Sequence, residues 1–364
     1  MNYTEIYVVP TGFSGNGGTS ESDALDIDTA FANLSPGQRI NIKQGIYQGL
    51  FAQGVSAGGS FTSLCSIRGY KNTPGDGFLG RNPDGTLNTG NMPTLIYQID
   101  TEYESSQFSY CINDSLIIYT SGVTAVPFRA NSAGNWYYNC YLENRPISTG
   151  HMFSLSAGCG LVNCDLNYPN AASGAPVIRL TQNGKIENCR IASKYASGVG
   201  VLFDGANTAS LRGAYIGNST LFNHMDGISC RFAGGNPSLV ISNNTISKCS
   251  GTAISMTPSL LTYHPVVFNN YVSDCTWFLN SASANAWASM YGNRVFTRLG
   301  NNNIISDQYV SSTGWNYGSG EHYTDFTNNN FNLTTISLGR RSSVIRNRDI
   351  GAMQSYDSFN SAGG

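Results

Sequence analysis

The sequence predicts an all-β fold, a single-stranded right-handed parallel β-helix with coils of about 25 residues. Only 12% of the 364 residues are charged, against about 25% in an average globular domain, and 41 residues are glycine. A short motif also recurs, with one apolar residue two places before an asparagine and another three places after it. Frequent turns, with polarity supplied by amides and hydroxyls, favour stacked short strands over helices.

The repeat defines the coils of the predicted solenoid. Successive asparagines are separated by 24, 25, 30, 25 and 26 residues, a period too short and too rich in glycine for a pair of helices. A second apolar segment with strand alternation follows each asparagine by about 14 residues. The repeated asparagines are Asn139, Asn163, Asn188, Asn218, Asn243 and Asn269.

Stacking of the coils gives these repeated residues a structural role. We expect the asparagines to be buried and to hydrogen-bond through their amides from coil to coil. Cys140, Cys164 and Cys189 share one repeat position, and Cys249 and Cys275 share another. We expect these thiols to be reduced and packed in the core.

The rest of the chain divides around this solenoid. Residues 1–50 are expected to form a strand at 6–9 and a capping helix at 23–34, which covers the first coil. Residues 51–300 form the β-helix, from which a Gly/Pro/Asn-rich insertion at 71–93 projects as a loop. Residues 301–364, where the repeat decays, form an irregular contact segment.

Composition excludes several classes of function. A net charge of −2, with no basic or acidic run, argues against binding to nucleic acid or to a membrane surface. No apolar run is long enough to span a bilayer, and the start at Met1 lacks the features of a signal peptide. Nine cysteines without CxxC spacing argue against a zinc site or a disulfide framework. We therefore expect folding in a reducing cytoplasm, with no metal and no cofactor.

The N-terminal region carries a family resemblance. Its residues run Tyr7-Val8-Val9, Gly17-Gly18-Thr19-Ser20, Leu34-Ser35-Pro36-Gly37 and Gly45-Ile46-Tyr47. With the later repeats, this resembles the pectin-lyase-like parallel β-helix superfamily over roughly residues 5–300. That superfamily includes lyases, hydrolases, phage tailspikes and non-enzymatic virion proteins, so the resemblance implies a fold and leaves the activity open. The Asn-Thr-Asp, Asp-Asp and Gly-His-Gly motifs of polygalacturonases are absent, as are the calcium-binding aspartates and Arg-x-Pro-x-x-Arg run of pectate lyases. No catalytic residue is carried over.

Acidic residues on neighbouring coils are the candidates for catalysis. Glycoside hydrolysis needs two carboxylates about 5–9.5 Å apart, and strands about 4.8 Å apart could supply them. The best set is Asp204 and Asp226, with His224 to orient an acid and with Glu187 and Glu143 further along the stack. A purely structural role is favoured, because aspartate before glycine is a common turn-former.

Arginines mark two candidate contact surfaces. Arg129, Arg179 and Arg231 fall on the second strand of their coils and could bind an acidic glycan, although a solvated row paired with Asp204 is favoured. The C-terminal segment combines aromatic residues with arginines, as interface centres do. We expect a subunit or capsid contact at Trp315, Tyr317, Arg340, Arg341, Arg346 and Arg348.

These features together favour a bacteriophage-type virion structural protein, either a capsid-decorating protein or a tail-associated β-helix. It would assemble in the host cytoplasm and contact itself, with a trimer as the favoured state, and other virion proteins. One alternative is a polysaccharide-degrading tailspike, lyase or glycosidase. Another is a glycan-binding adhesin without turnover, whose partner would be a surface polysaccharide.

Overall fold

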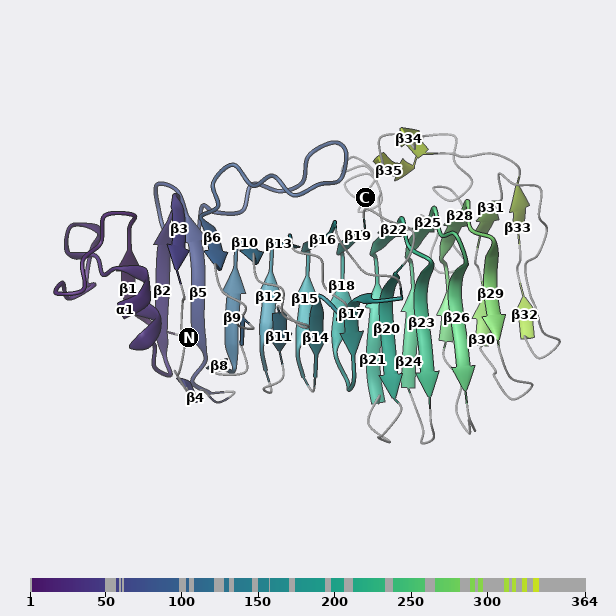
Figure 1. The fold of residues 1–364 in the computed structure, drawn as a ribbon, viewed down its shortest axis with the longest axis horizontal. Coiled ribbons are helices and arrows are strands. Elements are labelled where there is room, and N and C mark those ends of the chain that lie inside the picture. Colours follow the sequence, from purple (N-terminus) through teal and green to yellow (C-terminus); the bar gives the residue numbers. More distant parts are fainter. Residues whose placement is uncertain are drawn as a thin grey trace, which may run out of the picture.

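The predicted all-β parallel solenoid is confirmed by a computed structural model of the chain (Figure 1). Helices within the described residues are limited to η1 (Glu21–Asp23) and α1 (Ile27–Ala32). The structure describes residues 2–49, 57–58, 60, 62–97, 103–104, 108–120, 128–130, 134–145, 150–156, 158–169, 174–193, 198–205, 212–232, 238–258, 266–281, 289–291, 294–296, 311–313, 316–318, 323–325 and 330–333.

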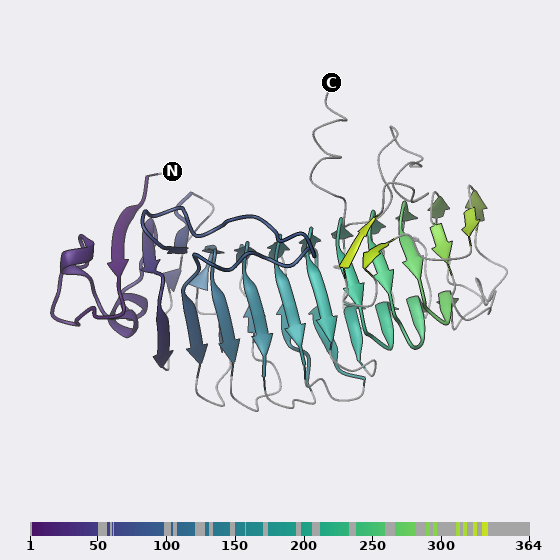
Figure 2. The same cartoon turned by 90° about the horizontal axis from the view of Figure 1, so that it is seen from above.

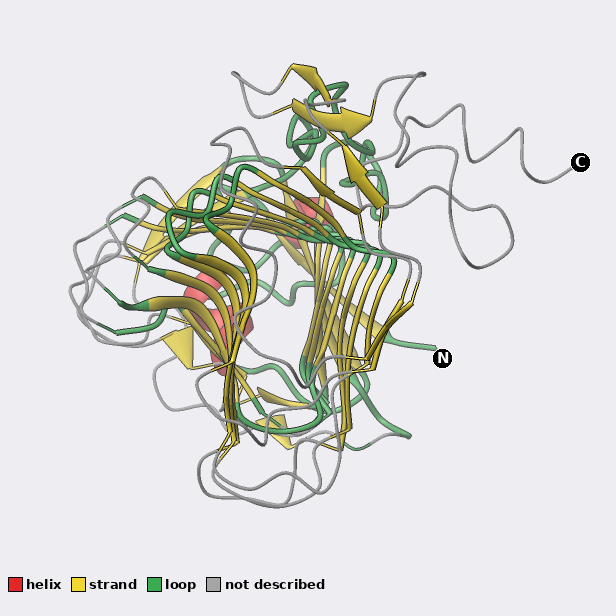
Figure 3. Cartoon of the chain, turned by 90° about the vertical axis from the view of Figure 1, so that its right-hand side faces the viewer, coloured by secondary structure: helices red, strands yellow, loops and turns green. Residues whose placement is uncertain are grey.

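Three parallel sheets form the walls of the solenoid, as the view along its axis shows (Figure 3). Sheet 1 contains, in spatial order, β1 (Thr4–Val8), β2 (Gln38–Lys43), β5 (Cys65–Tyr70), β9 (Cys111–Asp114), β12 (Trp136–Tyr138), β15 (Gly160–Val162), β18 (Lys185–Glu187), β21 (Arg212–Gly217), β24 (Ser238–Ser242), β27 (Val266–Phe268), β30 (Ser289–Tyr291) and β32 (Ser311–Thr313).

Sheet 2 contains β3 (Ile46–Gly49), β6 (Thr94–Tyr97), β10 (Ile117–Thr120), β13 (Tyr141–Asn144), β16 (Asp165–Tyr168), β19 (Arg190–Ser193), β22 (Thr220–Phe222), β25 (Thr245–Ser247), β28 (Tyr271–Ser273), β31 (Arg294–Phe296) and β33 (Asn316–Gly318). Sheet 3 contains β7 (Tyr103–Glu104), β11 (Phe128–Ala130), β14 (Phe153–Leu155), β17 (Pro176–Leu180), β20 (Val199–Gly205), β23 (Asp226–Phe232), β26 (Thr252–Pro258) and β29 (Trp277–Ser281). Two short pairs complete the strands: β4 (Ala57–Gly58) with β8 (Phe108–Ser109), and β34 (Tyr323–Asp325) with β35 (Asn330–Leu333).

The core lies inside the three sheets and consists of apolar stacks. In sheet 1, Leu161, Ile186 and Ile216 are register partners in successive coils, and each is fully buried. Sheets 2 and 3 contribute similar stacks, such as Leu166 below Ile191. Because every coil places apolar residues at the same inward positions, the core is continuous along the solenoid axis.

The repeated asparagine lies at the sharp corner between sheets 1 and 2. All six copies have φ between 51° and 55°, in the left-handed region that asparagine tolerates better than most residues. The predicted amide ladder is present from Asn139 to Asn188: Asn163 Nδ2 donates to Asn139 Oδ1 at 2.7 Å, and Asn188 Nδ2 donates to Asn163 Oδ1 at 2.9 Å. The prediction that these amides are buried holds for Asn269, which is 2% exposed, and was wrong for Asn163, which is half-buried, and for Asn188, which is exposed.

The buried ladder occupies the next residue of each corner instead. There, Cys164 Sγ donates to the Tyr137 carbonyl at 3.4 Å, and Asn270 Nδ2 donates to the Ile241 carbonyl at 3.1 Å. Cysteine and asparagine thus serve one purpose, which is to satisfy a buried carbonyl of the preceding coil. All nine cysteines are free and buried.

The N-terminal helix is shorter than the predicted 23–34. Asp26 is its N-cap, because Asp26 Oδ1 accepts the Thr29 N–H at 2.9 Å and so ends any continuation toward residue 23. Ile27, Ala30 and Phe31 are buried, and α1 lies beside β1 at the end of the solenoid (Figure 1).

Residues 71–93, which we call the finger, join β5 to β6. The sequence predicted a projecting loop, but the finger instead lies along the solenoid beside β10, β13, β16 and β19 (Figures 1 and 2). Its two limbs pair through Asn82 N–H to the Thr86 carbonyl at 2.8 Å and Asn88 N–H to the Gly80 carbonyl at 3.0 Å. The finger is therefore an ordered hairpin-like ribbon laid against the outer face of sheet 2.

Candidate functional site

The structure does not bring Asp204 and Asp226 together. Both lie on sheet 3, but the register of β20 and β23 pairs Asp226 with Val199 and Asp204 with Arg231. The two aspartates are thus separated by five positions along the strand, roughly 16 Å at ~3.3 Å per residue. This separation exceeds the spacing that paired catalytic carboxylates require.

Each of these aspartates has a local partner. Arg179 donates to Asp204 Oδ2 from Nε at 2.9 Å and from Nη2 at 2.6 Å, which is the ion pair that the sequence favoured. Asp226 Oδ1 accepts the Thr252 N–H at 2.9 Å, and burial raises the pKa of its carboxyl.

The remaining catalytic candidates are placed elsewhere. His224 is fully buried, with Nε2 3.1 Å from the Ile191 carbonyl, and burial lowers its pKa to about 4. It occupies the corner position that Cys249 and Cys275 occupy in the next coils, directly after a residue with positive φ. Glu187 lies on sheet 1, 2.5 Å from Lys185 Nζ.

Of the three arginines expected to form one row on sheet 3, two occupy the same register position and the third does not. Register partners connect Arg129 through Ser154 to Arg179, whereas Arg231 lies two positions further along its strand. Of the predicted interface residues, Tyr317 belongs to β33, and Trp315, Arg340, Arg341, Arg346 and Arg348 lie outside the described residues.

A cavity of about 220 Å³ lies between the finger and the outer face of sheet 2. The sheet contributes Tyr119, Tyr141 and other outward side chains of β10, β13 and β16, and the returning limb of the finger contributes the opposite wall. We call this cavity the groove, and its lining residues are Thr86, Leu87, Thr89, Ile117, Tyr119, Tyr141 and Asp165.

The aromatic residues of the groove are held in fixed orientations. The rings of Tyr119 and Tyr141 meet edge to face, with centroids 6.0 Å apart. The Arg145 guanidinium lies 3.7 Å from the centroid of the Tyr119 ring. Both tyrosines are half-buried, so part of each side chain remains open to a ligand.

A polar network adjoins these rings and is centred on Glu143. Its carboxylate accepts the Tyr141 hydroxyl at 2.6 Å, Asn167 Nδ2 at 2.9 Å and Arg145 Nε at 3.0 Å. Burial, followed by the hydrogen bond to Glu143, raises the pKa of the Tyr141 hydroxyl, which therefore remains a donor at neutral pH. The network presents directed donors and acceptors beside an aromatic surface.

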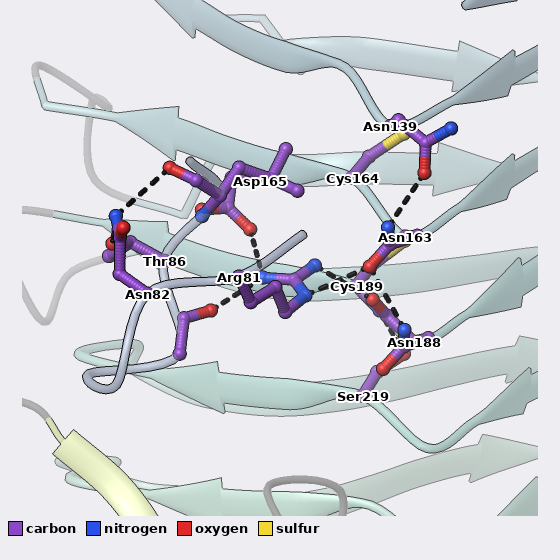
Figure 4. Close-up of polar contacts among 12 residues, drawn as sticks. Arg81, Asn82, Thr86, Asn139, Asn163, Cys164, Asp165, Asn188, Cys189 and Ser219 are labelled. Carbon is purple, nitrogen blue, oxygen red and sulfur yellow. Dashed lines mark hydrogen bonds and ion pairs between the residues drawn. The ribbon is translucent and has the colours of Figure 1, made fainter. Parts of the chain in front are cut away.

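Asp165 fixes the finger over the groove (Figure 4). Arg81 Nη1 from the outgoing limb lies 2.7 Å from Asp165 Oδ1, and the Leu87 N–H from the returning limb lies 2.8 Å from Oδ2. Arg81 also donates from Nε to Asn163 Oδ1 at 2.9 Å and from Nη2 to the Asn188 carbonyl at 3.0 Å. Asp165 is only 2% exposed, so its charge is compensated within the protein.

Sequence reasoning named Glu143 but missed Tyr119, Tyr141, Asp165 and Arg81 as a site. One signal was present: Tyr141 and Asp165 each follow the corner asparagine by two places, so they share an outward row of sheet 2. Nothing in the repeat indicated that the finger would cover this row.

The described parts of the chain contain neither a metal-binding cluster nor a membrane-spanning helix. No group of three or more His, Cys, Asp or Glu side chains is placed to hold a metal ion. No helix there has the length and apolarity needed to cross a membrane.

Comparisons with known proteins identify the fold. No family model and no curated protein sequence matches the chain. A solved structure of the pectate lyase Pel9A superposes with a TM-score of 0.61 at 14% identity, covering 97% of both chains. The chain has the pectin-lyase-like right-handed parallel β-helix fold. The structural resemblance predicted from the N-terminal motifs is thereby confirmed, while the phage subtype stays a prediction.

Other similar structures are more distant. A rhamnogalacturonan lyase has a TM-score of 0.48 at 13% identity, covering 89% of this chain and 91% of that one. A GH136 lacto-N-biosidase from Eubacterium ramulus has a TM-score of 0.44 at 13% identity, covering 87% and 67%.

Proposed function

We propose that this protein binds a polysaccharide chain in the groove between the finger and sheet 2. The observation that carries the proposal is the composition of the groove, in which two half-buried tyrosines face a wall with two threonine side chains. A sugar ring has an apolar C–H face and a rim of hydroxyls. An aromatic surface bordered by a few oriented polar groups complements both features.

The Glu143 network supports the same ligand class. Its members hold one another in place before any ligand arrives, so binding would require little ordering of side chains. Asn167 and Arg145 thus place amide and guanidinium groups beside the groove, the kinds of group that bind sugar hydroxyls. The chain shares its fold with a pectate lyase, and a polysaccharide ligand is consistent with that similarity.

Binding without cleavage is favoured over turnover. Both oxygens of Asp165 accept hydrogen bonds from the finger, and Glu143 accepts three from its neighbours. A hydrolytic pair needs one carboxyl to protonate the leaving group and another to act on water or on the sugar. The acids at the groove are committed to structural contacts.

The test is binding to a panel of soluble acidic and neutral polysaccharides, including polygalacturonate, alginate, hyaluronate, dextran and arabinoxylan. We expect at least one of these polysaccharides, embedded in the gel, to retard the protein in affinity electrophoresis, and Tyr141→Ala to weaken that binding about tenfold, equivalent to ~1.4 kcal/mol. Tyr215→Ala, at a half-buried tyrosine on sheet 1, is the matched control and should bind as the wild type does. An equal loss of binding in the two variants, or no binding by the wild type, would refute the proposal. Release of short oligosaccharides from a polysaccharide would show that the protein cleaves its ligand.

A place in a bacteriophage-type particle, with self-association into a trimer, is a separate proposal that rests on the sequence. Low charge and the lack of enzyme motifs support it. Mass spectrometry of purified particles and the solution mass of the isolated protein are its tests. Absence from particles together with a monomeric mass would exclude it.

A further inference from the structure

We propose that the finger is a gate held shut by one latch, Arg81 on Asp165, and that its release opens the groove sideways for a polymer. This inference rests on the proposed function, because a gate over the groove is meaningful only if the groove receives a ligand. The evidence is the way in which the finger is attached.

Among the described residues, the hydrogen bonds between the finger and the solenoid are confined to its base and its far end. At its base, the Asp76 carboxylate accepts the Lys71, Asn72 and Thr73 N–H groups, and Asn91 Nδ2 reaches the Asp76 carbonyl at 2.9 Å, which ties the two limbs together. These bonds lie within the finger itself. Two bonds anchor the base to the solenoid: Gln44 Nε2, between β2 and β3, donates to the Gly90 carbonyl at 2.6 Å, and the Ile117 N–H of β10 donates to the Pro93 carbonyl at 3.0 Å.

At the far end, four hydrogen bonds join the finger to the solenoid, and two of them end on the Asp165 carboxylate. The Asp165 carboxylate accepts hydrogen bonds from the Arg81 guanidinium on one limb and from the Leu87 N–H on the other. The other two bonds run from the Arg81 guanidinium to Asn163 Oδ1 and to the Asn188 carbonyl. Loss of the guanidinium would remove three of these four bonds at once. Opening of this end breaks few hydrogen bonds and exposes one buried apolar side chain, Leu87, so we expect it among the lower-energy native-state fluctuations.

The course of the finger explains why a gate is needed. It follows the outer face of sheet 2 past β10, β13, β16 and β19 (Figure 2), and its returning limb lines the groove together with Tyr119 and Tyr141. A short oligosaccharide could enter from an open end of the groove. A long polymer has no nearby end, so it must be laid in from the side, which requires the finger to lift.

The finger also supplies one wall of the groove. Thr86, Leu87 and Thr89 come from the returning limb, directly beside the latch. A bound ligand would therefore contact the closed finger as well as the sheet. By linkage, ligand binding should favour closure as much as closure favours binding.

The first test needs no ligand and compares Arg81→Gln with the wild type by amide hydrogen exchange and hydroxyl-radical footprinting. We expect exchange at residues 80–88 to rise tenfold or more and oxidation of Ile117 and Tyr141 to rise severalfold. Arg39→Gln, which removes a different arginine–carboxylate pair, with Glu5 at the first coils, is the matched control and should change neither readout. Unchanged exchange at 80–88, or an equal rise throughout the solenoid, would overturn the proposal.

A second test distinguishes failure of the gate from failure of the proposed function. With the panel polysaccharide that binds, Arg81→Gln should speed association of the polymer severalfold and leave that of its tetrasaccharide unchanged. Equal effects on both would overturn the gate while leaving glycan binding intact. If no polysaccharide binds the wild type, the proposed function fails, and the first test still decides whether Arg81 is a latch.

Discussion

Asn188 shows how a single corner residue combines two properties. It has a φ of 53° and donates its amide to Asn163 Oδ1. The recurrence of asparagine was readable from the sequence, and so was its bonding between coils. The left-handed backbone was not foreseen, and it is the reason that the side chain points outward while the next residue points into the core.

These two properties can be separated by substitution. Asn188→Gly keeps the backbone conformation and loses only the amide bond, so we expect a cost of about 0.5–1.5 kcal/mol. Asn188→Leu loses the bond and forces a branched side chain into the left-handed region, which adds roughly 1–2 kcal/mol. Urea denaturation of both variants measures the difference, and equal stabilities would show that the φ value carries no cost.

His224 makes stability depend on pH. Because burial lowers its folded pKa from 6.5 to about 4, the unfolded chain binds the proton more tightly. The stabilising contribution is therefore complete above pH 6.5 and is lost as pH falls toward 4. We expect this group alone to cost roughly 2–3 kcal/mol between pH 7 and pH 4.5.

The control is His224→Cys, which copies the residue found at the same corner in the next two coils. Denaturation of both proteins at pH 7 and pH 4.5 isolates the histidine, since the other titrating groups cancel. An identical loss of stability in the two proteins would contradict the assignment.

At the scale of elements, strands were easier to predict than the finger. The period-two alternation inside each coil depends on local sequence, and it placed the second strand of each coil, which belongs to sheet 3. The position of the finger depends on Arg81 meeting Asn163 and Asp165, partners 82 and 84 residues away. No local pattern encodes such a contact, which is why the groove was missed.

The N-terminal helix offers a test at this scale. Asp26 is the cap of α1, so Asp26→Ala should destabilise the protein by about 1 kcal/mol, whereas Asp26→Ser should restore most of that loss. Thermal unfolding followed by circular dichroism measures both variants. A serine variant no better than alanine would show that the cap does not act through its hydrogen bond.

At the scale of the whole molecule, the reactivity of the buried thiols shows whether the solenoid is fully folded. Burial raises the pKa of Cys65 to about 11 and that of Cys111, Cys164 and Cys189 well above the ordinary range, so little thiolate exists at neutral pH. We expect titration without reductant to find nine thiols in denaturant and almost none in the native protein. Rapid native labelling of a core cysteine would indicate that its coil opens locally.

The finger also changes how the solenoid should come apart. In a simple stack, each coil touches only its neighbours, so the end coils can fray one at a time. Arg81 instead joins the chain between β5 and β6 directly to Asn188, 107 residues later, bypassing the coils in between. The first coils are consequently bound to the middle of the rod as well as to the next coil. While the finger is latched, fraying of the first coils is therefore opposed by this distant tie as well as by the next coil, and release of the finger removes that extra restraint.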